Sequence, residues 1–134
     1  MRYCLDSLTI IAALRGRVPG VEARLRGLEP GQVWISEVVR AELLFGAVKS
    51  GRPERNRRLV EAFIAPMEWV AFGGEAVEHY CLIRTQLEQE GRMIGGNDLL
   101  IAATARATGA VVVTGHRREF ERVPGLVVED WTVG

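Results

Sequence analysis

The feature that most constrains the fold is an uninterrupted apolar run at residues 110–114, Ala-Val-Val-Val-Thr, which comes straight after an apolar segment of helix length. A strand without a polar face is typical of a sheet that helices cover on both sides. Shorter apolar runs alternate with amphipathic segments along the rest of the chain. This alternation predicts an α/β fold with a central, mostly parallel sheet.

Capping residues, prolines and glycines divide the chain into its expected elements. We expect strands over residues 3–5, 32–35, 69–72, 110–114 and 126–128. We expect helices over residues 7–14, 21–28, 36–49, 53–64 and 75–90, and from residue 97 toward Gly109. The apolar residues of segment 75–90 fall on one helical face and are Ala76, Val77, Tyr80, Ile83 and Leu87. Because no repeat, linker or low-complexity segment interrupts the pattern, we predict a single domain over residues 1–134.

Composition excludes several classes of protein. Seventeen basic residues balance seventeen acidic ones, which argues against a protein that coats nucleic acid by charge alone. Cys4 and Cys81 lie in apolar patterns without metal-ligand or redox spacing, so we expect buried free thiols in a reducing compartment. The N-terminal segment is not typical of a signal peptide, and no stretch reaches the length of a membrane span. We therefore expect a cytoplasmic protein.

Three carboxylates stand where a structural role explains them poorly. Asp6 follows the first strand, at the edge of the sheet where α/β proteins carry their sites. Glu42 lies roughly 200° round its helix from Arg40, on an apolar face where a buried charge needs compensation. Asp98 follows Asn97 at the start of the helix that is apolar on nearly every side. Helix capping by Asp6 or Asp98, and a solvated Glu42, remain the alternatives.

The types of residue in this set indicate a divalent cation. Several carboxylates without a histidine partner are typical of an oxygen-lined site for Mg²⁺ or Mn²⁺. Zinc is disfavoured because His79 and His116 are the only histidines and their spacing is not that of a zinc site. No phosphate-binding loop ends on the single lysine, Lys49, and no Gly-x-Ser-x-Gly elbow of a serine hydrolase is present.

Three motifs resemble PIN-domain ribonucleases of the VapC toxin type: Leu-Asp-Ser at residues 5–7, Ala-Glu-Leu-Leu-Phe-Gly at 41–46, and Ile-Gly-Gly-Asn-Asp-Leu-Leu-Ile-Ala-Ala at 94–103. The tail from Val113 to Leu126, with Arg-Glu-Phe-Glu-Arg-Val-Pro-Gly, continues the likeness. The resemblance implies a three-layer α/β/α domain and an endoribonuclease whose acids hold metal. Matched residue by residue, Asp6, Glu42 and Asp98 correspond to the family's catalytic, metal-binding acids.

The resemblance also indicates supporting groups. Ser7, Asn97, His116 and Glu119 are candidates to support the metal site, and the candidates for contacts to RNA phosphates are Arg117, Arg118 and Arg122. Two positions depart from the family. Leu8 replaces an asparagine, and His116 replaces an acid or amide, so we expect one well-occupied ion and weaker binding of a second.

The expected function is therefore that of the toxin in a toxin–antitoxin pair, hydrolysing RNA by metal-activated water with Mg²⁺ or Mn²⁺. The expected partners are a VapB-like antitoxin, RNA (tRNA among the candidates) and a second copy of the chain, without a membrane. We expect the helix over residues 53–64 to bury Leu59, Val60, Phe63 and Ile64 against another chain, with packing on its own sheet as the alternative. A catalytically inactive binding module and a receiver-like or flavodoxin-like domain are the rival interpretations.

Overall fold

The computed structural model describes residues 1–16 and 18–132. Its centre is a parallel sheet with the strand order β3-β2-β1-β4-β5. The strands in this part of the chain are β1 (Tyr3–Leu5), β2 (Val33–Ser36), β3 (Glu68–Val70), β4 (Val111–Val113) and β5 (Val128–Glu129). The first strand is therefore the middle one, and Cys4 lies between Trp34 on one side and Val112 on the other.

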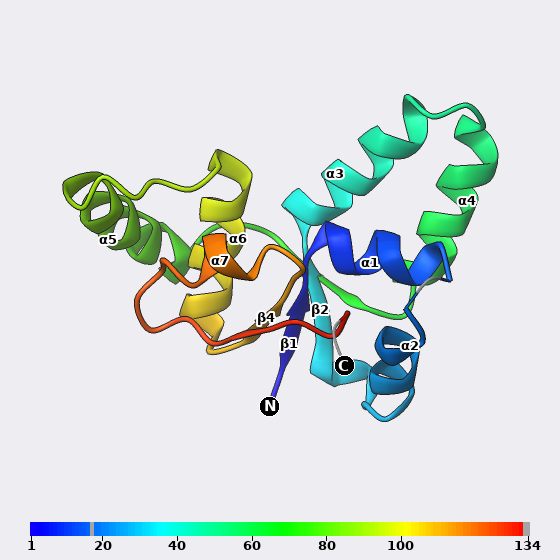
Figure 1. The fold of residues 1–134 in the computed structure, drawn as a ribbon, viewed down its shortest axis with the longest axis horizontal. Helices are drawn as coiled ribbons and strands as arrows, with labels where there is room; N and C mark the ends of the chain where they lie inside the picture. Colours follow the sequence, from blue (N-terminus) through cyan, green and yellow to red (C-terminus); the bar gives the residue numbers. More distant parts are fainter. Residues whose placement is uncertain (17, 133–134) are drawn as a thin grey trace.

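Helices lie on both sides of the sheet, which confirms the predicted three-layer α/β architecture. Figure 1 shows the first four helices on the right of the sheet and the last three on the left. The described helices are α1 (Ser7–Leu14), α2 (Pro19–Arg26), α3 (Glu37–Val48), α4 (Pro53–Ile64), α5 (Glu75–Gln89), α6 (Gly96–Thr108) and α7 (Arg117–Phe120), with a 3-10 turn, η1 (Pro30–Gln32), before β2.

Most of the predicted elements are present, and the central ones match best. Every residue of β4 is buried, and so are the flanking Ala110 and Thr114, as a strand covered on both faces requires. Ser36 caps α3 as expected, because its hydroxyl accepts a hydrogen bond from the Val38 N–H at 3.0 Å. Pro19 opens α2 two residues earlier than predicted, since proline suits the first position of a helix.

The edges of the fold differ from the prediction. Strand β3 begins at Glu68, and β5 covers Val128 and Glu129 only. Trp69 in β3 is 45% exposed, because an edge strand has a neighbour on one side only. The short helix α7 and the turn η1 were not predicted, since segments of three or four residues are too short to show a periodicity.

Two expectations about apolar residues were wrong, and for a third the alternative interpretation holds at two residues. Cys81 is exposed rather than buried, while Cys4 is buried as expected. Helix α5 buries only the stripe of Ala76, Ile83 and Leu87, so Cys81 and Val77 lie on its outer side. On α4, Val60 and Ile64 belong to the chain's own core, so the alternative interpretation holds for them; Leu59 remains 44% exposed.

The sheet brings the ends of distant segments together. In a parallel sheet all strands finish at the same edge. β1 runs directly into Asp6 and α1, β2 ends at Ser36 and leads into α3, and β4 runs into Thr114 and the loop before α7. The described part of the chain contains no helix of the length and hydropathy that crossing a bilayer requires.

Candidate active site

Asp6 is the most firmly held carboxylate at this edge of the sheet. Its side chain is 3% exposed, and both of its oxygens accept hydrogen bonds. Oδ1 accepts from the Ser7 backbone N–H at 2.7 Å and thereby caps α1, while Oδ2 accepts from the Thr114 hydroxyl at 2.8 Å. The same hydroxyl oxygen of Thr114 accepts from the His116 N–H at 2.9 Å. Asp6 is thus a cap, as the alternative interpretation allowed, and is also oriented by the end of β4.

Thr114 is a site residue that the sequence analysis did not single out. Its hydroxyl is buried and connects Asp6 to the backbone of the loop before α7. Its sequence position could have revealed it, because Thr114 is a polar residue at the carboxyl end of an otherwise apolar strand, and α/β proteins carry their sites at that edge of the sheet.

Glu42 comes from α3 and reaches the same edge half-buried. Its Oε2 accepts a hydrogen bond from the Asn97 amide at 3.4 Å, and its Oε1 is buried without a hydrogen-bond partner among the described residues. Burial raises the pKa of Glu42, and the negative charge of Asp6 raises it further; the hydrogen bond from Asn97 and the nearby hydroxyl of Ser7 act in the opposite direction. A buried carboxylate oxygen without a partner is costly, so this atom is available to a ligand.

Asp98 does not cap α6. The N-cap of that helix is Gly95, which makes no side-chain capping bond, and Asp98 lies in the first turn facing Glu119. Burial raises the pKa of Asp98 to about 8. The hydrogen-bonded carboxyl of Glu119 acts in the same direction, and so do the negative charges of Asp6 and Glu42. The opening of this buried helix therefore carries an acid for a reason other than helix capping.

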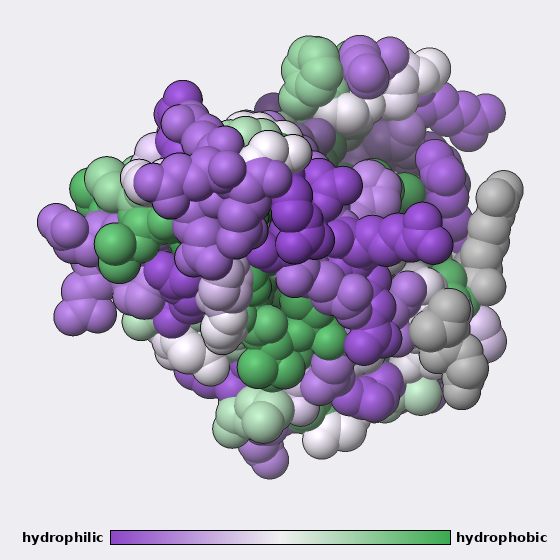
Figure 2. Space-filling view, turned by 60° about the vertical axis from the view of Figure 1, so that its left-hand side comes forward, coloured by the Kyte–Doolittle hydropathy of each residue, from purple (hydrophilic) through white to green (hydrophobic). Residues whose placement is uncertain are grey.

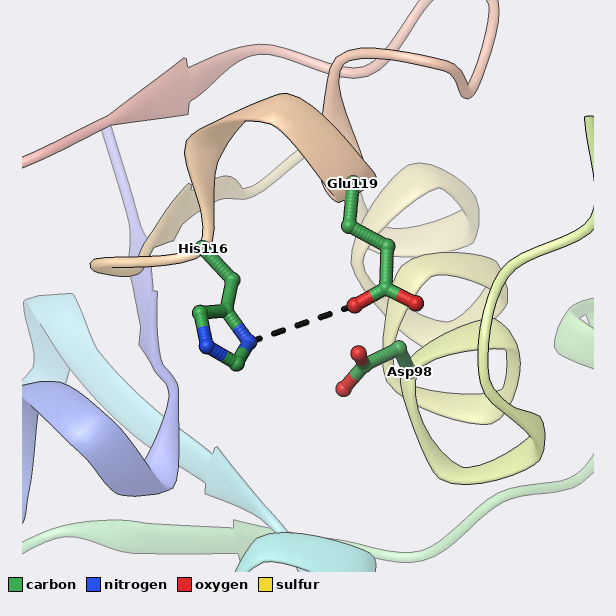
Figure 3. A group of neighbouring side chains, drawn as sticks. All are labelled: Asp98, His116 and Glu119. Atoms are coloured by element: carbon green, nitrogen blue, oxygen red, sulfur yellow. Dashed lines mark ion pairs between the residues drawn. The ribbon is translucent and has the colours of Figure 1, made fainter.

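Glu119 and His116 complete this side of the site from α7 and the residue before it (Figure 3). Glu119 Oε1 accepts a hydrogen bond from the Gly95 N–H at 2.7 Å. The hydrogen bond from Asp98 holds the pKa of Glu119 below its ordinary value, so the two carboxyls share one proton, held mainly by Asp98. His116 Nδ1 lies 4.0 Å from Glu119 Oε2, and one ligand atom from each of Asp98, His116 and Glu119 lies within 4.8 Å of the others.

The three candidate arginines differ in whether their side chains are already paired with other groups of the protein. Arg117 is paired with Glu121, and Arg122 donates to the Met93 carbonyl at 3.0 Å. Arg118 is exposed and has no ion pair or hydrogen bond within the described ranges. A hollow beside the carboxylates is lined by Gly115, His116, Arg117, Arg118, Glu119 and Arg122. Hydrophilic residues cover most of the face of the molecule that carries the last helices (Figure 2).

The residues present fit a divalent cation. The donors are carboxylate oxygens, with an amide and one imidazole beside them, which is a set for a hard or borderline ion. Glu42 Oε1 lacks a partner, and Asp98 and Glu119 lie so close that they share a proton. A divalent cation relieves both conditions, because it supplies positive charge at these oxygens beyond that of Arg122, which already lowers the pKa of Glu119.

Comparison with known proteins shows which proteins this chain is similar to. A family model described as PIN domain matches residues 3–126. The chain is 37% identical over 132 residues to a protein of Shigella flexneri named tRNA(fMet)-specific endonuclease VapC, covering 98% of this chain and 99% of that protein. Two solved structures superpose with a TM-score of 0.91: VapBC2 from Rickettsia felis bound to a promoter DNA fragment, at 36% identity, and DNA-bound VapBC from Salmonella typhimurium, at 37%. They cover 98% of this chain and, respectively, 99% and 98% of theirs.

Proposed function

The chain belongs to the PIN-domain family, and from this membership we propose that it is an endoribonuclease, the toxin of a VapBC-type toxin–antitoxin pair. The observation that carries the proposal is the convergence of Asp6, Glu42, Asp98 and Glu119 at one edge of the sheet, each acting on the pKa of another. Such a group has no use in a purely structural role, because like charges held together destabilise the fold.

The catalytic residues that we propose are Asp6, Glu42 and Asp98, which would hold Mg²⁺ or Mn²⁺ with Glu119 beside them. When bound, the cation supplies positive charge that favours ionisation of water and offsets charge on the scissile phosphate. The chain's own groups do the positioning. Thr114 and the Ser7 N–H fix both oxygens of Asp6, and Asn97 orients one oxygen of Glu42.

The substrate that we propose is RNA, with tRNA as the class to test first because the Shigella flexneri relative is named for tRNA(fMet). Arg118 is the arginine best suited to a backbone phosphate, since it is exposed and unpaired in the described part of the chain while Arg117 is paired with Glu121. Replacing Arg118 by Gln therefore raises KM for RNA more than the same change at Arg117, and the difference shrinks at high salt.

The protein partner that we propose is a VapB-like antitoxin, because the similar solved structures are VapBC complexes. A groove of about 500 Å³ between α1, α3 and α4 reaches Glu42, and its lining includes the exposed Leu59 and the basic Arg15, Lys49 and Arg55.

On the outer side of α3, Phe45 and Val48 are 63% and 58% exposed. These side chains support the further proposal of a homodimer, which the mass of the purified protein by light scattering tests.

A cleavage assay tests the function. The substrates are tRNA(fMet) and a second tRNA, and each is incubated with the protein in chelator and again after Mg²⁺ or Mn²⁺ is returned. We expect metal-dependent cleavage that leaves 5′-phosphate ends. Cleavage should be lost in Glu42→Gln and retained in Glu54→Gln, a matched change at an exposed residue of α4. Equal cleavage by Glu42→Gln, or in chelator, would contradict the metal site. A wild-type chain that binds antitoxin but cuts no RNA would favour the inactive binding module, the alternative that Leu8 and His116 suggest.

A further inference from the structure

One nitrogen stands among the oxygens of the candidate active site. The imidazole of His116 faces the carboxyls of Asp98 and Glu119, and one ligand atom from each of the three lies within 4.8 Å of the others (Figure 3). Ligands about 2.1 Å from an octahedral ion lie roughly 3–4 Å apart. A small rotation of the exposed His116 ring toward the half-buried carboxyls of Asp98 and Glu119 therefore brings all three onto one cation. This triplet mixes ligand types, which Asp6, Glu42 and Asp98 do not.

The environment of His116 leaves its ring free to bind an ion. The backbone N–H is fixed by the hydrogen bond to Thr114 Oγ1, so the position of the residue is set by the end of β4. The ring itself is 59% exposed and accepts or donates no hydrogen bond among the described residues. His79, the other histidine, differs because its Nδ1 already accepts a hydrogen bond from Arg106 Nε at 2.8 Å.

The kind of donor determines the kind of ion. Mg²⁺ binds oxygen ligands, whereas an imidazole nitrogen favours divalent transition metals, with Mn²⁺ at the weak end of the series. Building on the proposed nuclease function, we propose that His116, Asp98 and Glu119 form a mixed nitrogen–oxygen site that selects Mn²⁺ over Mg²⁺. His116 is then a metal ligand that sets cation preference, and its replacement of the family's acid or amide changes which ion the site holds.

Electron paramagnetic resonance of bound Mn²⁺ tests the ligand directly, without reference to activity. The wild-type protein with Mn²⁺ should show hyperfine coupling to an imidazole ¹⁴N, and labelling with ¹⁵N-histidine should change that coupling. The His116→Asn variant keeps a neutral oxygen donor and should lose the coupling. His79→Asn is the matched control and should retain it, because His79 is engaged by Arg106.

Competition between the two ions gives a second readout. Titration of the wild type with Mn²⁺ and Mg²⁺ should show a ratio of affinities about tenfold larger than in His116→Asn. Bound Mn²⁺ without imidazole coupling, with the same ratio in both proteins, would overturn the His116 ligand and leave a metal-dependent nuclease intact. Failure of the folded wild type to bind either ion would contradict both this site and the proposed metal dependence.

Discussion

Two sides of the same site hold their carboxylates in opposite ways. On the sheet side, Asp6 is buried and both oxygens accept hydrogen bonds, from the Ser7 N–H and the Thr114 hydroxyl. On the side of α6 and α7, Asp98 faces another carboxyl, Glu119, and the pair shares a proton. An acid surrounded by donors keeps its geometry with or without a cation. An acid held against another acid needs a proton or a cation, so this side changes most when metal binds.

The largest expected effects follow from replacing the acid on each side: cleavage should fall in both variants, and the stability of the fold should change in opposite directions. Asp98→Asn and Asp6→Asn should each reduce RNA cleavage by more than about 100-fold, because both remove a proposed metal ligand. Without metal, Asp98→Asn should stabilise the fold, on the order of 1 kcal/mol, since the neutral amide needs no proton to lie against the carboxylate of Glu119. Asp6→Asn should destabilise the fold, because the new amide disturbs the bond from Thr114.

Thermal unfolding in chelator, beside cleavage rates with Mg²⁺ and Mn²⁺, measures both quantities. If the two variants shift Tm in the same direction, the two sides do not differ as described. Wild-type cleavage by Asp98→Asn would remove Asp98 from the catalytic set.

The next effect concerns the donor that fixes Asp6. Thr114→Val keeps the shape of the side chain but leaves Asp6 Oδ2 and the His116 N–H without their partner. We expect the free energy of unfolding to fall by about 1–3 kcal/mol and cleavage to fall by roughly 10–100-fold. Thr114→Ser retains the hydroxyl and is the control; it should keep most of the activity. Denaturant unfolding and initial cleavage rates check the pair, and equal losses in both variants would show that packing rather than the hydroxyl matters.

A smaller effect is the pH dependence of stability without metal. The folded pKa of Asp98 is about 8 against an ordinary 3.8, so its contribution is fully present below about pH 4 and is lost as pH rises through 8. The raised pKa of Glu42 acts in the same direction, while the lowered pKa of Glu119 gives stability that is lost only in acid.

Unfolding free energy measured in chelator should therefore decline from about pH 5 to 8, and the decline should be weaker in Asp98→Asn. Saturating Mn²⁺ should reverse the decline, because metal binds the ionised form. A flat profile for the wild type in chelator would show that Asp98 is ionised throughout and that the two sides are alike.

The smallest effect lies at Leu8, which is 38% exposed in the first turn of α1, two residues after Asp6. Leu8→Asn restores the amide of the family pattern. This amide lies on the sheet side of the site, where hydrogen bonds already hold Asp6 in place. We expect metal affinity to rise by no more than about tenfold, since such supporting groups act indirectly. Calorimetric titration with Mg²⁺ measures it, with Leu59→Asn on α4, another half-exposed leucine, as the matched control. No change in affinity would show that residue 8 lies outside the site.

The sequence alone determined the elements whose signals are local. The apolar run at residues 110–114 predicted β4, and the cap at Ser36 predicted the start of α3, because burial on two faces and capping act within a few residues. Asp6 was chosen for its place at the end of the first strand, Glu42 for its apolar helical face, and Asp98 for its place at the start of a buried helix. All three signals are visible in the neighbouring residues. The location of these three acids at one edge of the sheet was therefore predictable from local signals, and their catalytic and metal-binding roles stay predictions.

Only the tertiary structure decided how those members are held. The Thr114 hydroxyl reaches Asp6 across 108 positions of the chain, and the Glu119 carboxylate reaches the Gly95 N–H across 24. The exposure of Cys81 likewise depends on which face of α5 packs inward, because apolar residues lie both on the buried stripe and beside it. Strand order sets the two hydrogen bonds, and helix packing sets the exposure of Cys81, because both place segments that no local pattern relates. The partner of each carboxylate, and hence which acid needs a cation, is a property of the folded sheet edge.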